Sequence, residues 1–176
     1  MVILLGITPE APEVEYGWIE PGISLGIPVP NSVCRVIRFW EKPSAMLASV
    51  LMKRGCLWNS FVMVGRVQAF LKLMRHALPR LVEAFESIRP SFFTVSERAA
   101  LCDLYSGIRA TSFSQDVLSV CPQDLAVLCG TGLGWSDLGE PSRVLSVLER
   151  KGVQPEWGFK PREGGGRVLV RREEAG

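Results

Sequence analysis

Histidine and closely spaced cysteines, which bind metals and act in nucleophilic sites, are scarce in this sequence. It has one histidine, His76, and five scattered cysteines with no C-x-x-C spacing. A zinc site, or a nucleophile activated by histidine, therefore has too few partners to be expected. An odd, dispersed set of cysteines is instead typical of reduced, mostly buried thiols, so we expect a cytoplasmic protein. The five are Cys34, Cys56, Cys102, Cys121 and Cys129.

An excess of one charge sign and long apolar runs are also lacking. The formal net charge is +2, from 20 Lys and Arg against 18 Asp and Glu, and the chain contains no basic block. This balance argues against a nucleic-acid partner held through its phosphates. No apolar run approaches the roughly 18 residues that would cross a bilayer, so we expect no membrane partner either.

What the chain has in quantity is apolar residues, which make up 47% of its 176 positions. That is enough for the core of one domain, or of a substantial part of a larger one. Hydrophobic periodicity, with Ser44 as a helix cap and Pro141 as a helix start, predicts alternating strands and helices. The strands are expected at 2–7, 16–19, 33–39, 58–64 and 125–129, and the helices at 44–54, 67–78, 81–88, 96–105 and 141–151.

Alternation of strands and helices predicts an α/β fold, and we expect a mixed, largely parallel sheet flanked by helices. Residues 21–31 read as a turn-rich connection. The pattern fades after Gly152, so residues 153–176 are expected to form a flexible tail rich in glycine and charge.

One short motif combines a carboxylate and an ammonium group at the end of a strand. It reads Phe39-Trp40-Glu41-Lys42-Pro43, and Pro43 ends the strand because proline has no backbone N–H. A Glu-Lys pair in that place could bind sugar hydroxyls with one group and a phosphate with the other. By itself, such a turn is more often a solvated loop, since Lys and Glu are mostly surface residues.

Four further motifs accompany it in a fixed order. They are Leu5-Gly6-Ile7-Thr8-Pro9, Tyr16-Gly17-Trp18-Ile19, Leu57-Trp58-Asn59-Ser60 and Gly134-Trp135-Ser136-Asp137-Leu138-Gly139. Together the five resemble the later part of mannose-1-phosphate guanylyltransferases, within the sugar-phosphate nucleotidyltransferase family. The resemblance covers about Val2 to Gly152. It implies that residues 1–152 form the sugar-phosphate half of a Rossmann-like nucleotide-diphospho-sugar transferase domain.

The resemblance also implies a reaction. In that family a sugar 1-phosphate attacks the α-phosphorus of a nucleoside triphosphate, giving a nucleotide sugar and pyrophosphate with the help of Mg²⁺. The attacking phosphate is already anionic, so catalysis consists of aligning two polyanions and neutralising their charge. We expect mannose 1-phosphate, GTP and Mg²⁺ as the substrates and cofactor.

Roles for individual residues follow from the resemblance alone. Lys42 matches the lysine that holds the sugar phosphate, and Asp137 matches the aspartate that binds the catalytic magnesium, so both are candidate catalytic residues. A lone carboxylate such as Asp137 is also a common turn former or helix cap, and this alternative stays open. The candidate substrate-binding residues are Tyr16, Gly17, Glu41, Lys42 and Asn59.

The sequence also departs from the family pattern. The glycine-rich nucleotide-binding half is absent, so we expect a truncated enzyme or one completed by a separate N-terminal half. Phe61 stands where the family has glycine. Ser114 stands where the family has an acidic residue, unless Asp116, two residues later, takes that place. The alternative function is a non-catalytic module that binds a sugar phosphate or a partner chain. In that case an exposed sheet edge would favour a homo-oligomer.

Overall fold

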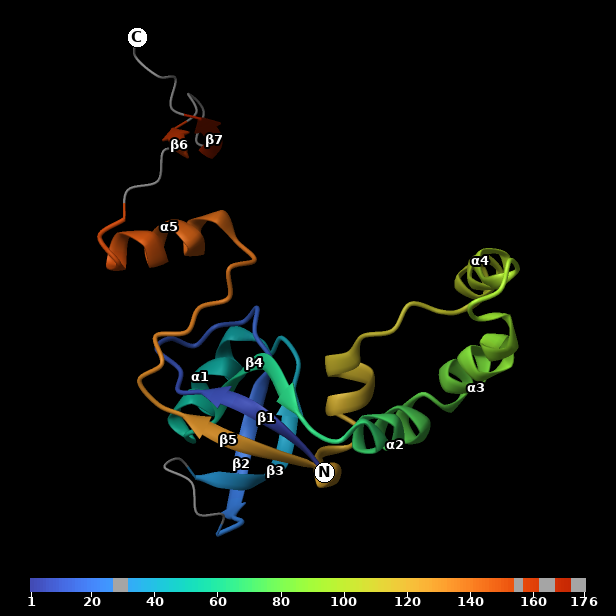
Figure 1. The fold of residues 1–176 in the computed structure, drawn as a ribbon. Helices are drawn as coiled ribbons and strands as arrows, with labels where there is room; N and C mark the ends of the chain where they lie inside the picture. Colours follow the sequence, from blue (N-terminus) through green and yellow to red (C-terminus); the bar gives the residue numbers. More distant parts are fainter. Residues whose placement is uncertain (27–31, 154–156, 162–166, 172–176) are drawn as a thin grey trace. The chain divides into compact units, whose positions relative to one another are not determined.

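The computed structural model of this chain describes residues 1–26, 32–153, 157–161 and 167–171 (Figure 1). The chain divides into two compact units, Met1–Leu133 and Gly134–Gly176. Among the described residues, no helix is long and apolar enough to cross a membrane.

The first unit is built on a closed five-stranded sheet with the strand order β1-β4-β2-β3-β5. The pairs β1–β4, β4–β2, β2–β3 and β3–β5 are antiparallel, and β1–β5 is parallel. The strands are β1 (Val2–Ile7), β2 (Trp18–Ser24), β3 (Val33–Trp40), β4 (Leu57–Val64) and β5 (Leu125–Gly130).

This topology corrects the expectation of a largely parallel sheet, because four of its five pairings are antiparallel. A parallel pair needs a crossover of a dozen residues or more, whereas residues 25–32 connect β2 to β3 too briefly for one. Each strand also has two neighbours, so the exposed edge expected for a binding module is not found in this sheet.

The core lies between the sheet, helix α2 (Val67–Ala77) and a π-helical turn, η2 (Phe113–Leu118). β1 contacts it closely at Gly6, where an added Cβ would lie 2.6 Å from Val127 Cγ2 and 2.7 Å from Leu57 Cδ1. A side chain at position 6 would therefore push β1 away from its neighbours. Fully buried members of this core include Val2, Leu4, Ile19, Val117, Leu118, Leu125 and Val127.

β2 is longer than the sequence indicates, since it continues through Pro21 to Ser24. The pairing with β3 changes register on both sides of Pro21, so this residue stands at an irregularity in the ladder. Proline is tolerated at such places because it has no N–H to donate. The prediction of a turn beginning at residue 21 was therefore wrong.

The helices of the first unit follow the predicted pattern. Ser44 caps α1 (Ala45–Lys53), its Oγ accepting the Leu47 N–H at 3.3 Å. Helix α2 packs against the core through the buried Leu73. Helices α3 and α4 contain no buried residue. They contact each other through the rings of Phe85 and Tyr105. The helices after α1 are α2 (Val67–Ala77), α3 (Pro79–Ile88) and α4 (Glu97–Gly107), with 3-10 turns at η1 (Arg89–Ser91) and η3 (Pro122–Asp124).

The second unit contains α5 (Pro141–Arg150) and an antiparallel pair, β6 (Trp157–Pro161) and β7 (Arg167–Arg171). The helix agrees with the predicted range 141–151. The predicted domain boundary after Gly152 stays a prediction. Much of the expected tail, including residues 162–166 and 172–176, lies outside the described residues.

Two isoleucines on β2 test the position of the core. Ile19 is fully buried and Ile23 is 73% exposed. We expect Ile19→Ala to lower the free energy of unfolding by about 2–5 kcal/mol, because it leaves a cavity. Ile23→Ala should change it by less than about 0.5 kcal/mol. Urea unfolding of both variants measures the difference, and equal losses would contradict this description of the core.

Candidate functional site

Three of the predicted substrate-binding residues lie side by side where neighbouring strands meet. β2 runs between β3 and β4, with Trp18 opposite Trp40 on one side and opposite Trp58 on the other. Because both pairings are antiparallel, Gly17, which precedes Trp18, lies beside Glu41, which follows Trp40, and beside Asn59, which follows Trp58. The Asn59 N–H donates to the Gly17 carbonyl at 2.7 Å.

Gly17 has no room for a side chain, because the other two residues close over it. A Cβ there would lie 3.1 Å from Glu41 Oε2, 3.3 Å from Asn59 Cβ and 2.8 Å from Phe39 Cζ. The glycine of this motif therefore allows the Glu41 carboxylate and the Asn59 side chain to lie close together at the rim of the sheet.

Glu41 is half-buried, and Ser114 of η2 forms a hydrogen bond with its carboxylate. Burial raises the pKa of Glu41, while the Ser114 hydroxyl and the nearby Lys42 ammonium act in the opposite direction. Ser114 is itself only 6% exposed. The carboxylate is thus held in place by a hydroxyl from a distant part of the chain.

Buried aromatic residues flank the site residues in the sequence, Tyr16 next to Gly17 and Trp58 next to Asn59. Tyr16 and Trp58 are both buried, and their rings meet edge to face at 5.1 Å. Trp18 contacts Trp58 at 6.3 Å and donates its indole N–H to the Glu13 carbonyl at 2.8 Å. The Trp58 indole N–H is buried without a hydrogen-bond partner among the described residues, which costs about 1–3 kcal/mol.

Lys42 lies beside Glu41, but its ammonium group binds Glu15. The Nζ–Oε2 distance is 3.0 Å, and both side chains are 57% exposed. The Lys42 backbone has φ 45°, in the left-handed region that residues with a side chain rarely adopt. Such a conformation costs on the order of 1–3 kcal/mol and fixes the direction in which the turn presents this lysine.

Asp137 belongs to the second unit, whereas the other predicted site residues belong to the first. Its Oδ1 accepts the Gly139 N–H at 2.9 Å, and its Oδ2 lies 3.4 Å from an Arg143 nitrogen. This is the turn-forming role that the sequence left open. Within the part of the chain that the structure describes, no three His, Cys, Asp or Glu side chains group to hold a metal.

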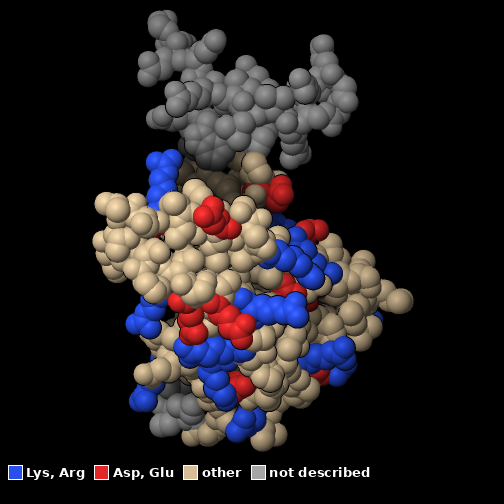
Figure 2. Space-filling view, turned by 90° about the vertical axis from the view of Figure 1, so that its right-hand side faces the viewer, with Lys and Arg blue, Asp and Glu red and all other residues tan. Residues whose placement is uncertain are grey.

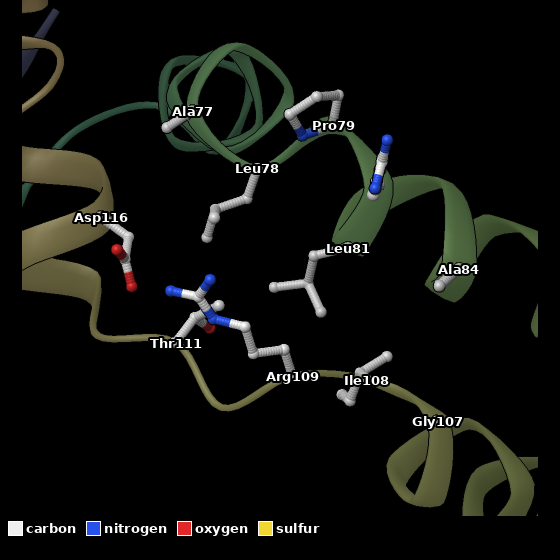
Figure 3. A pocket seen from close by; sticks show the side chains of 11 residues that line it. Ala77, Leu78, Pro79, Leu81, Ala84, Gly107, Ile108, Arg109, Thr111 and Asp116 are labelled. Carbon is white, nitrogen blue, oxygen red and sulfur yellow. The ribbon is translucent and has the colours of Figure 1, made fainter.

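A hollow of about 590 Å³ lies elsewhere in the first unit (Figure 3). Leu78, Leu81 and Ile108 form its apolar lining, with Arg109 directed toward Asp116. It contains none of the predicted site residues. We place the candidate site at Gly17, Glu41 and Asn59 instead, because polar groups converge there and partial burial strengthens their interactions.

Charged side chains of both signs lie on one face of the protein. On the face in Figure 2, acidic and basic side chains lie interspersed without a broad patch of one sign. A surface of this kind gives no support for binding a nucleic-acid backbone.

Comparison with known proteins identifies the family. The sequence model of the family described as "Nucleotidyl transferase" matches residues 1–151. This chain is a nucleotidyl transferase family member.

Relatives of this nucleotidyl transferase chain are much longer. It is 26% identical to a mannose-1-phosphate guanylyltransferase of Escherichia coli, over 96% of this chain and 33% of the relative. It is 28% identical to the xanthan biosynthesis protein XanB of Xanthomonas campestris, over 86% of this chain and 31% of that protein. A third relative, mannose-1-phosphate guanylyltransferase of Sinorhizobium fredii, is 33% identical over 78% of this chain and 26% of the relative. The chain thus spans about a third of the length of its curated relatives.

Solved structures agree with the fold. A Thermus thermophilus protein described as mannose-1-phosphate geranyltransferase matches with TM-score 0.66 and 28% identity, over 88% of this chain and 41% of that one. A Helicobacter pylori protein described as mannose-6-phosphate isomerase matches with TM-score 0.59 and 23% identity, over 77% of this chain and 51% of that one. At that identity, the second match speaks for the fold alone.

The sequence did not identify two residues that contact members of the candidate site, Ser114 and Glu15. Ser114 was noted as a departure from the family pattern, but not as a partner of Glu41. Glu15 was assigned no role from the sequence. Neither position has a local signal, because the contacts join segments 27 and 73 positions apart in the chain, from Glu15 to Lys42 and from Glu41 to Ser114.

Burial of Glu41 predicts a stability effect that depends on pH. Its folded pKa is raised above the ordinary 4.5, so the folded state loses stability as pH rises through the folded pKa. Glu41→Gln should therefore raise the melting temperature near about pH 7.5, with the gain vanishing near about pH 4. Thermal unfolding at both pH values measures this. Glu83→Gln, an exposed carboxylate on α3, controls for net charge, and equal gains in both variants would contradict the prediction.

Proposed function

We propose that this chain forms the sugar-phosphate-binding part of an enzyme that joins a sugar 1-phosphate to a nucleoside triphosphate, releasing pyrophosphate. Mannose 1-phosphate and GTP are the proposed substrates. The observation that carries the proposal is the close placement of the Glu41 carboxylate and the Asn59 side chain around Gly17. Family membership and the names of the relatives support the same reaction class.

Glu41 and Asn59 offer complementary hydrogen-bonding groups to sugar hydroxyls. The Glu41 carboxylate accepts hydrogen bonds, and Ser114 is one of its partners. Asn59 Oδ1 accepts the Phe61 N–H at 3.2 Å, which turns the amide NH₂ group toward other acceptors. A sugar hydroxyl that donates to Glu41 and accepts from Asn59 would satisfy both side chains.

Lys42 would bind the phosphate of the same ligand. Its ion pair with Glu15 is solvent-exposed, and such pairs contribute only about 0–1 kcal/mol. A phosphate with two negative charges is a stronger partner than one carboxylate, so it would displace Glu15. Glu15 thereby acts as a competitor that occupies Lys42 until the ligand arrives.

Asp137 is the described residue that would hold Mg²⁺. A single carboxylate fits this ion, because Mg²⁺ commonly takes one or two protein carboxylates and completes its shell with phosphates and water. When bound, the ion would neutralise charge on the phosphates. Asp137 would have to exchange its contact with Arg143 for the ion, while its Gly139 hydrogen bond keeps the turn in shape.

Calorimetric titration of the 176-residue chain with mannose 1-phosphate tests the binding part of this proposal. We expect Lys42→Ala to weaken binding by about 10-fold, the loss of one charge-assisted contact. Glu15→Gln should strengthen binding by about 2-fold to 5-fold, because the competitor is removed. Lys53→Ala, an exposed lysine in the last turn of α1, is the matched control and should bind like the wild type.

Pyrophosphate release with Mg²⁺, mannose 1-phosphate and GTP then separates an enzyme from a binding module. Turnover that is lost in both Lys42→Ala and Asp137→Ala would support a working site in this chain. Binding without turnover would favour the non-catalytic alternative. A wild-type chain that binds no mannose 1-phosphate would overturn the proposal.

A further inference from the structure

The strand that carries Asn59 contains a bulge immediately after it. In the pairing of β1 with β4, Leu4 lies opposite Met63 and Gly6 lies opposite Asn59. Residues 60–62 are therefore opposite Leu5 alone. Bulges of this kind redirect a side chain and are frequent beside active sites.

Side chains within the bulge satisfy its backbone. The Ser60 hydroxyl donates to the Leu5 carbonyl at 2.6 Å and accepts the Val62 N–H at 3.2 Å. Asn59 Oδ1 accepts the Phe61 N–H at 3.2 Å. The conformation of Phe61 is thus fixed from both sides, and its backbone N–H orients the Asn59 amide.

Phe61, at the tip of the bulge, has a conformation that favours glycine. Its φ is 61°, and its side chain is 55% exposed. Neither feature is explained by core packing, because a left-handed backbone costs free energy for a bulky residue and an exposed ring recovers little of it by burial. Phe93 shares this backbone conformation and exposure, so the two features alone assign no role. What distinguishes Phe61 is its place beside Asn59 and its contact with Phe113.

Phe61 contacts Asn59 through its backbone, and its ring contacts the segment that carries Ser114. The ring meets Phe113 edge to face at 6.4 Å, with an angle of 81° between the ring planes. Phe113 immediately precedes Ser114, which binds Glu41, and Phe61 itself contacts Asn59. Phe61 and Phe113 are therefore each linked to the candidate site, Phe61 through its backbone N–H to Asn59 and Phe113 through the adjacent Ser114.

We propose that Phe61, supported by Phe113, is a substrate-positioning residue that packs against the apolar C–H face of a pyranose ring. The face of an aromatic ring is electronegative, and sugar C–H groups carry a small positive charge. Ligand sites commonly combine such an apolar surface with a few polar groups that fix orientation. This inference rests on the proposed function, since it assumes that the sugar lies at Glu41 and Asn59.

Titration of Phe61→Gly with mannose 1-phosphate and with inorganic phosphate tests this role. We expect binding of the sugar phosphate to weaken by about 5-fold and binding of phosphate to stay unchanged, because the ring contacts only the sugar. The melting temperature should stay equal or rise, since glycine adopts this backbone without strain. Phe61→Tyr, which keeps the ring, should bind mannose 1-phosphate within about 2-fold of the wild type.

Phe93 provides a matched control. It has φ 62° and a fully exposed side chain, and it lies in the turn before α4. Phe93→Gly makes the same chemical change in the same backbone conformation, so it should leave the binding of both ligands unchanged.

Each outcome decides the inference. If Phe61→Gly binds mannose 1-phosphate as tightly as the wild type, or loses both ligands equally, the positioning role is wrong. Lys42→Ala distinguishes that result from a failure of the proposed function, because it should still lose both ligands. If the wild type binds mannose 1-phosphate no more tightly than inorganic phosphate, the proposed function and this inference fail together.

Discussion

Closure of the sheet between β1 and β5 is the constraint on which the rest of the first unit depends. The parallel pairing of Leu4 with Val127 joins strands from opposite ends of this unit, and Gly6 lets β1 approach closely enough. Once the ring is closed, β2 has a neighbour on each side. The register of those two pairings brings Gly17, Glu41 and Asn59 together, so the site is a consequence of strand order.

Much of this could be read from the sequence because it depends on local patterns. The apolar run of β1 has the predicted bounds, and Ser44 marks the start of α1 through a hydrogen bond within one turn. Glu41 was correctly expected at a strand end, because Pro43 cannot continue the ladder. The roles of Glu41, Lys42, Asn59 and Asp137 remain predictions from family resemblance.

Other features could not be read because they depend on contacts between distant segments. Apolar runs such as that of β5 indicate burial on both faces, which suggests parallel strands, but a closed sheet buries antiparallel strands equally well. The π-helical turn at Phe113–Leu118 is too short for a helical period to show. The bonds from Ser114 to Glu41 and from Glu15 to Lys42 depend on the tertiary fold. Phe61 looked like a simple departure from the family pattern until its backbone conformation was known.

The five cysteines differ in exposure in the folded chain, and this difference has a practical consequence. Cys102 on α4 is exposed, whereas Cys34, Cys56 and Cys121 are buried and Cys129 is partly buried. Burial raises the pKa of Cys56 and Cys129 to about 11, and only a thiolate reacts readily with alkylating reagents. A maleimide dye added at neutral pH would therefore attach to Cys102, on a helix with no buried residue. The native sequence thus offers one fluorescent labelling position, and no cysteine needs to be removed first.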